Sequence, residues 1–317
     1  MPLQPARFLL ALYLFAPDVA AWAQTPATSP QKPAARKRAE AADPLAEARR
    51  ATAVAAVSSL AEEARDFRDE LLRARVQARA ADALWETDKT RARSLFRRAW
   101  EAAESADRDS QRRLEEAQRR TDPDAGRAVA VLRQRPNMRR EVLRLAARRE
   151  RELGEEFLSK MDEARKSETR ENAAESATEA RTPTPRINPD DPPAHMTQRL
   201  TLARQLLEDG DTERAMQFAD PALYPVNVYG VDFLNRLRAK NREAADQRFV
   251  RLLNEAANDP VADANSVSLL SSYVFTPFLY LTFDQKGDGH TRRWADDNSP
   301  PAELAPQVRA AFLRAAA

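Results

Sequence analysis

The chain has 317 residues but contains no cysteine and only two histidines. Without cysteine it has no disulfide, no thiolate nucleophile and no cysteine-ligated metal. His195 and His290 alone leave little material for histidine-based catalysis. The sequence also lacks a phosphate-binding glycine loop, an HExxH zinc motif and a GxSxG nucleophile motif. We therefore expect no cofactor and no metal ion, and we do not expect an enzyme.

Glycine is scarce, with six residues, while alanine, arginine and glutamate are abundant. This composition favours helices over sheets. Charged residues make up 32% of the chain, yet the net charge is only +2. Acids and bases are interspersed, so the totals give no reason to expect a nucleic-acid partner. In the first half, arginines alternate with acids at helical spacing, which predicts solvated, ion-paired helix faces.

The first 23 residues have the pattern of a secretory signal peptide. Arg7 precedes an apolar run over 8–16, and Ala21, Trp22 and Ala23 form a small-x-small site before Gln24. We expect cleavage after Ala23 and a mature protein that is secreted or periplasmic. An uncleaved anchor or a buried helix is the alternative interpretation. The apolar run is too short to span a bilayer, and no later segment is long and apolar enough.

Composition divides the rest of the chain into four parts. Residues 24–43, rich in proline, alanine and basic side chains, are predicted to be a disordered linker. Residues 44–166 form an N-terminal helical region, 167–197 a proline-rich linker, and 198–317 a C-terminal helical region.

Apolar spacing and capping residues predict the helices of the N-terminal region. Leu60, Phe67 and Leu72 fall on one stripe and predict a single helix there. Asp88 is placed to cap the helix that follows. Asn137 is placed to cap one long helix that continues past residue 158.

Two helical hairpins are predicted over 198–259. Gly210 ends the first helix, as a residue tolerant of positive φ does, and Asp211 or Thr212 caps the next. The pattern recurs with Asn241 in the second turn, about 31 residues later, close to the roughly 34-residue period of helix–turn–helix repeats. Four residues are placed on the inner faces of the second helices: Ala215, Phe218, Ala245 and Phe249.

The segment Leu206–Ala215 resembles the middle of a tetratricopeptide repeat, with a glycine ending one helix and an alanine where the helices approach closely. The resemblance implies a mainly α fold of stacked helical hairpins, and a generic helical bundle is the alternative. Turn and packing roles would then fall on seven residues: Gly210, Asp211, Ala215, Phe218, Asn241, Ala245 and Phe249.

A change in pattern near the C-terminus predicts a small β-hairpin over 278–294. Residues 278–283 are mostly strand formers, and a glycine-containing turn follows before Thr291–Trp294 return as the partner strand. Asp284 and Asp288 lie in that turn, in a faintly EF-hand-like context. Lys286 occupies a ligand position and Ala295 offers no closing carboxylate, so we interpret the loop as an ordinary acidic turn.

These observations leave three functional hypotheses. The first is a non-catalytic interaction scaffold whose stacked hairpins bind a peptide or protein partner. The second is an envelope-associated enzyme or small-ligand sensor with a site around 273–294, which requires a pocket lined by Tyr280, Asp284 and His290. The third is a structural spacer.

Overall fold

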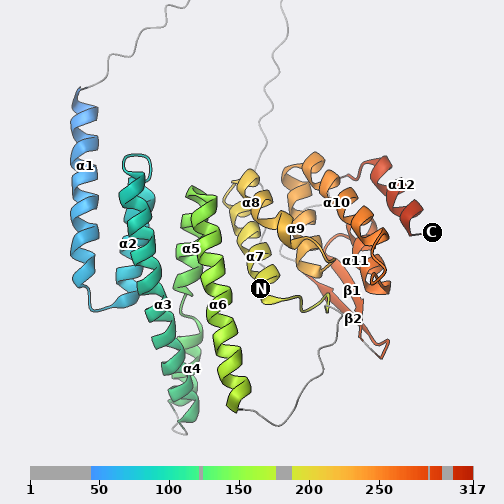
Figure 1. Ribbon diagram of the computed structural model, residues 1–317, viewed down its shortest axis with the longest axis horizontal. Coiled ribbons are helices and arrows are strands. Elements are labelled where there is room, and N and C mark those ends of the chain that lie inside the picture. The colour runs from blue at the N-terminus through green and yellow to red at the C-terminus, as the bar shows by residue number, and fades with distance from the viewer. Residues whose placement is uncertain (1–43, 121–123, 176–187, 285, 295–302, 317) are drawn as a thin grey trace, which may run out of the picture. The chain divides into compact units, whose positions relative to one another are not determined.

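The computed structural model describes residues 44–120, 124–175, 188–284, 286–294 and 303–316 (Figure 1). The predicted signal peptide, with Ala21, Ala23 and Gln24, and the linker 24–43 lie outside the described residues. The described chain is mainly α with one small antiparallel hairpin near its C-terminal end, which confirms the predicted fold class. The described residues from Ala48 onwards form one compact unit.

The N-terminal helices are α1 (Pro44–Glu63), α2 (Glu70–Leu84), α3 (Lys89–Arg119), α4 (Ala125–Arg133), α5 (Met138–Arg149) and α6 (Arg151–Glu175). The predicted single helix through Leu60 and Leu72 is wrong: both side chains are exposed, and a 3-10 turn separates α1 from α2. The Asp69 carboxylate causes the break, because it accepts hydrogen bonds from the first free backbone N–H groups of α2. The predicted caps at Asp88 and Asn137 are confirmed.

The long helix predicted after Asn137 is also interrupted. Glu150 has an extended backbone, so α5 and α6 pack against each other as a hairpin. No glycine or proline marks this break. Instead, the Glu150 carboxylate is bound by Arg93 of α3, with Nε and Oε2 2.8 Å apart, which ties the turn to the neighbouring hairpin.

The C-terminal helices are α7 (Ala194–Glu208), α8 (Thr212–Ala219), α9 (Val228–Lys240), α10 (Arg242–Ala257), α11 (Ala264–Phe275) and α12 (Pro306–Ala315). Their bounds confirm the two hairpins predicted over 198–259. The linker predicted at 167–197 is too long, because α6 continues to Glu175 and α7 begins at Ala194. The sequence from 167 to 175 contains no proline or glycine, so nothing in it ends α6.

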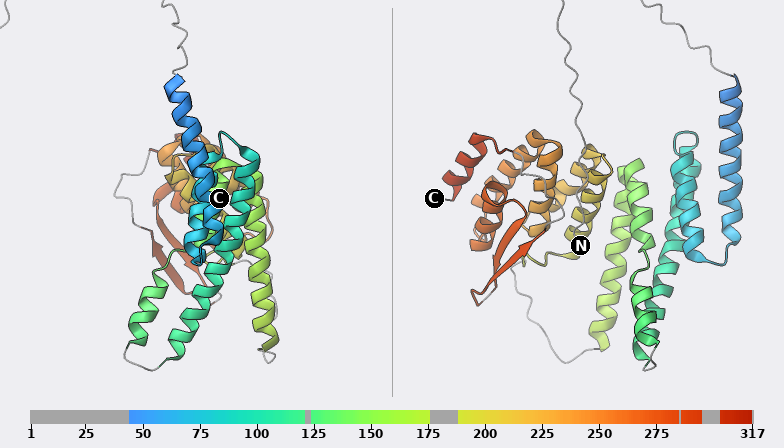
Figure 2. Two further views of the ribbon diagram at one scale, coloured as in Figure 1. Left: turned by 90° about the vertical axis from the view of Figure 1, so that its left-hand side faces the viewer. Right: turned by 180° about the vertical axis from the view of Figure 1, so that it is seen from behind.

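Successive hairpins contact one another in chain order (Figures 1 and 2). The α2/α3 hairpin packs on α5/α6, α5/α6 packs on α7, α7/α8 packs on α9, and α9 packs on α11. The two predicted helical regions therefore pack directly together. Arg199 of α7 donates to the Glu155 carboxylate of α6, with Nη1 and Oε1 2.8 Å apart. At Gly154 of α6, a side-chain carbon would lie only 2.6 Å from Cζ of Phe218 on α8.

The predicted β-hairpin is confirmed, with strands β1 (Leu279–Phe283) and β2 (Gly289–Arg293). The second strand begins two residues earlier than the sequence indicated. Tyr280 pairs with Arg292 in the antiparallel register. Helix α11 packs against β1, so the hairpin is attached to the last helical hairpin rather than standing alone.

Candidate functional site

The seven residues predicted for turns and packing hold the helical hairpins together. Gly210 has φ of +89°, the left-handed conformation that favours glycine. The Asp211 side chain accepts a hydrogen bond from Arg214 N, and Asn241 accepts one from Ala244 N at 3.1 Å. Four side chains are completely buried: Ala215, Phe218, Ala245 and Phe249. None of these four is available to a ligand.

The residues proposed for a site around 273–294 do not line one pocket. Tyr280 is completely buried, whereas Asp284 and His290 are exposed on the hairpin. His290 Nε2 lies 3.9 Å from the Asp284 carboxylate. Among the described residues, no three histidine, aspartate or glutamate side chains are placed to hold a metal ion.

Tyr280 belongs instead to a buried polar cluster on α9. Asn235 donates to Tyr280 Oη at 3.2 Å, and Arg236 Nε lies 2.9 Å from Oδ2 of Asp232. The other Asp232 oxygen has no hydrogen-bond partner among the described residues. Burial raises the pKa of Asp232 and also that of Tyr280. Tyr280 therefore stays protonated and serves as a hydrogen-bonding group of the core rather than as a nucleophile.

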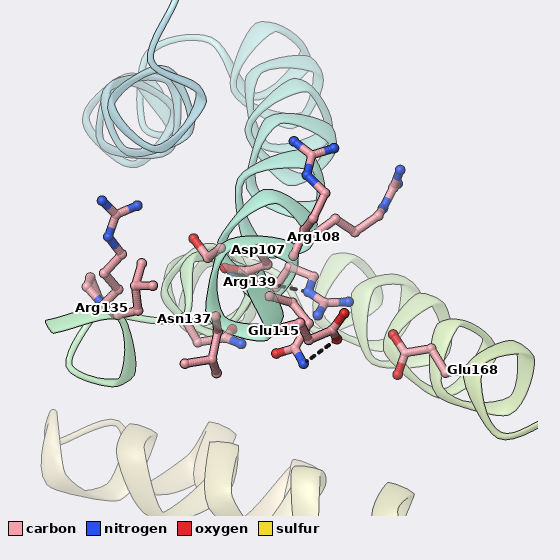
Figure 3. Close-up of a pocket in the computed structure, with 13 residues that line it drawn as sticks. Asp107, Arg108, Glu115, Arg135, Asn137, Arg139 and Glu168 are labelled. Atoms are coloured by element: carbon pink, nitrogen blue, oxygen red, sulfur yellow. Dashed lines mark hydrogen bonds and ion pairs between the residues drawn. The ribbon is translucent and has the colours of Figure 1, made fainter. Parts of the chain in front are cut away.

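A long cleft runs beside the C-terminal half of α3, and we call it the α3 cleft. It consists of two hollows that share Arg108, Ser110, Arg112 and Arg135. The first, about 560 Å³, lies against the end of α4 and the start of α5, with Glu168 of α6 on its rim (Figure 3). The second, about 1070 Å³, extends to Arg68 and the first turn of α2.

Many arginines in the N-terminal helices are paired with an acid on a neighbouring helix. Arg93 and Arg97 of α3 bind Glu150 and Glu156, while Arg149 of α5 binds Asp82 of α2 at 2.7 Å. Pairing by Arg97 lowers the pKa of Glu156. The sequence predicted ion pairs at helical spacing along one face, such as Arg112 with Asp109, and did not predict these pairs between helices. Some arginines on the outer surface of these helices, such as Arg127 and Arg133, have no such partner among the described residues.

The second hollow of the α3 cleft contains five arginines and only three carboxylates. Each carboxylate already has a partner: Asp69 caps α2, Glu70 binds Arg73, and Asp109 binds Arg112 and Arg113. Arg68 and Arg135 are exposed and have no ion-pair partner among the described residues. The hollow therefore has an excess of positive charge that no described acid neutralises.

At the base of the first hollow, the polar groups already hydrogen-bond to one another. Asp107 accepts from Met138 N at 3.1 Å, from Arg139 N at 3.2 Å and from Arg139 Nε at 3.0 Å. Asn137 accepts from Arg140 N, so the free N–H groups at the start of α5 are largely occupied. Figure 3 shows Arg139 lying against Asp107, with Arg135 set apart from both. Binding capacity in the cleft therefore lies with the unpaired guanidinium groups and not with the helix terminus.

The C-terminal hairpins have a smaller pocket of about 250 Å³, lined in part by Tyr224, Pro225 and Val261. The Tyr224 hydroxyl donates to the Asp259 carboxylate at its rim. Burial and this hydrogen bond raise the pKa of Tyr224 to about 12, and the same bond lowers the pKa of Asp259. The charged side chains that line this pocket are thus acidic, and they already accept hydrogen bonds.

Comparison with protein-family models, curated proteins and solved structures gives no match for this chain. The resemblance to tetratricopeptide repeats therefore stays a prediction. Among the described residues, no helix combines the length and the apolar character needed to cross a membrane.

The sequence did not point to the α3 cleft, because its arginines follow the same charge-alternating pattern as their paired neighbours. The signal in the sequence was local: the segment 108–113 contains three arginines and a single acid, Asp109. Which arginines lack a partner depends on contacts between helices distant in the sequence, as Arg68 and Arg135 show.

Proposed function

We propose that this protein is a non-catalytic binding protein that holds an acidic segment of a partner protein in the α3 cleft. The observation that carries the proposal is the presence of Arg68 and Arg135 in one hollow, where no acid of the described chain pairs with them. Guanidinium groups bind carboxylates through two parallel hydrogen bonds, which favours glutamate and aspartate side chains as their partners.

The form of the cleft supports an extended ligand rather than a single small anion. Its arginines are spread over the segment before α2, over α3, over the turn after α4 and over the start of α5, and the two hollows share Arg108 and Arg112. A peptide segment with several acids can contact such separated charges at once. A compact anion requires donors that converge on one point, and the described residues of the cleft offer no such arrangement.

The proposed cellular setting rests on the sequence alone. The basic residue, apolar run and Ala21–Ala23 site favour action outside the cytoplasm, as a secreted or periplasmic protein. The partner is then expected to be an exported protein or the exported part of one.

The test measures binding of a fluorescein-labelled glutamate-rich peptide to the full chain by fluorescence anisotropy. The double variant Arg68→Glu/Arg135→Glu reverses both unpaired charges in the cleft. We expect it to weaken binding about tenfold or more, since each exposed charge contributes a few tenths to about 1 kcal/mol. Binding by the parent protein should also weaken as salt concentration rises.

A matched control reverses two charges outside the cleft, in Lys240→Glu/Arg314→Glu. Both residues are exposed and have no ion-pair partner among the described residues, so net charge changes equally. We expect this variant to bind nearly as well as the parent. Equal weakening by both double variants would show that total charge, not the cleft, attracts the peptide. Displacement of the peptide by less single-stranded oligonucleotide than unlabelled peptide would contradict a protein partner.

A further inference from the structure

The two outer edges of the β-hairpin differ in whether other parts of the chain cover them. Trp294 N donates to Phe278 O, and Asp284 N donates to Asp288 O, which fixes the hydrogen-bonding pattern of the ladder. In this register, alternate residues pair across the ladder and the others direct their N–H and C=O groups outwards. The outward residues are Leu279, Leu281 and Phe283 on β1, and Gly289, Thr291 and Arg293 on β2.

Four of the six outward backbone groups of β1 have hydrogen-bond partners within the chain. Asn265 of α11 receives a hydrogen bond from Phe283 N at 2.6 Å and donates to Phe283 O at 3.0 Å. Ser268 donates to Leu281 O at 2.7 Å, and Leu279 N donates to Thr276 O. Side chains of α11 thus occupy the place of a third strand.

The outer edge of β2 has no such cover among the described residues. The backbone groups of Gly289, Thr291 and Arg293 that point away from β1 have no hydrogen-bond partner there, and all five residues of β2 are exposed. An exposed edge of this kind is a template for another strand, and proteins use it to bind extended peptides.

Side chains on the two faces of β2 define the chemistry of that peptide. His290 and Arg292 lie on one face, where His290 Nε2 is 3.9 Å from the Asp284 carboxylate and Arg292 has no acid within ion-pair distance among the described residues. Arg293 lies on the opposite face, beside Leu279. On that face, Leu281 and Phe283 remain 39% and 38% exposed. A side chain at Gly289 would lie 3.4 Å from Leu281 Cδ1, so the absent side chain leaves these two apolar groups open to an incoming strand.

We propose that β2 binds an extended segment of a partner protein in which acidic and apolar residues alternate, by addition of that segment as a third strand. Side chains of a strand alternate between faces, so the acids meet His290 and Arg292 while the apolar residues cover Leu281 and Phe283. This site shares no residue with the α3 cleft and does not depend on the function proposed for it.

The test uses a short fluorescein-labelled peptide of alternating valine and glutamate and the full chain. Thr291→Pro removes an outward N–H of β2 and leaves the hydrogen bonds between β1 and β2 intact, which edge strands tolerate. Thr291→Val is the matched control, because it keeps the N–H and the strand preference. We expect Thr291→Pro to weaken binding about tenfold and Thr291→Val to bind like the parent.

A second measurement uses the unchanged protein, so it does not depend on how the proline variant folds. Methylation of alternate backbone nitrogens in the peptide removes its strand hydrogen bonds without altering its charge, and binding should be lost. The proposal is overturned if the methylated peptide binds as tightly as the parent peptide, or if no peptide binding is seen. It is also overturned if sedimentation shows a dimer of this chain that Thr291→Pro disrupts, because the edge would then belong to a second copy.

Discussion

Replacement of Gly154 by alanine tests how closely the two helical regions pack. A Cβ atom at this position would lie 2.6 Å from Cζ of Phe218, 2.9 Å from Cβ of Ala147 and 3.1 Å from Cα of Ala147. Carbon atoms in contact are normally about 3.5–4.0 Å apart, so the new methyl group overlaps its neighbours by up to about 1 Å. Phe218 is completely buried, and its ring has no path to solvent.

Two effects of opposite sign determine the result. Alanine is favoured over glycine within a helix by about 1 kcal/mol. Overpacking of a filled core costs about 1–3 kcal/mol. Because one clash is with the backbone of α5 rather than with a flexible side chain, we expect the packing cost to be larger. The net result should be a loss of up to about 2 kcal/mol in the free energy of unfolding.

Gly126 provides the matched control, because it lies in α4 and nothing is within 4 Å of a Cβ built there. Gly126→Ala should therefore stabilise the protein by up to about 1 kcal/mol. Urea unfolding followed by circular dichroism at 222 nm gives both values. The difference between the two variants should be about 1–3 kcal/mol. Equal stabilisation by both substitutions would refute the close packing at Gly154.

Further predictions concern the hairpin turns and the α9 core. Gly210→Ala should lower the free energy of unfolding by about 1–2 kcal/mol, because its φ of +89° is strained for any other residue; urea unfolding measures it. Asn241→Ala should cost about 1 kcal/mol through loss of the cap on α10, again by urea unfolding, and an unchanged midpoint would contradict the capping role. Burial raises the pKa of Asp232 above its unfolded value, so the folded protein loses stability relative to Asp232→Asn as pH rises from the unfolded pKa towards the raised one. Thermal unfolding of both proteins across that pH range checks the sign, and a constant difference would count against it.

Features set by local sequence were predictable. Asp88, Asn137 and Asp211 cap helices as expected, because a cap depends on one side chain and the next three residues, and Asn241 of the predicted turn caps α10 in the same way. The alternation that predicted the β-hairpin is equally local. The break at Glu150 was not predictable in this way, since it depends on Arg93 of another hairpin.

The candidate binding sites were less predictable than the fold. Tyr280 and His290 are close in sequence and lie on the same face of the hairpin, yet the packed helices bury the first and leave the second exposed. Arg68 and Arg135 are far apart in sequence and look like their paired neighbours, but folding brings them to one hollow. Ion pairs between helices form only when the helices pack together, so the charge pattern along one helix does not reveal them.

The cover that Asn265 and Ser268 give to β1 has a consequence for assembly. A sheet that can grow from both sides is able to propagate indefinitely from molecule to molecule, as fibres do. Here α11 covers the edge of β1, so a further strand is added at the edge of β2. Even if two copies met through β2, the contact would be symmetric and would close on itself as a finite pair.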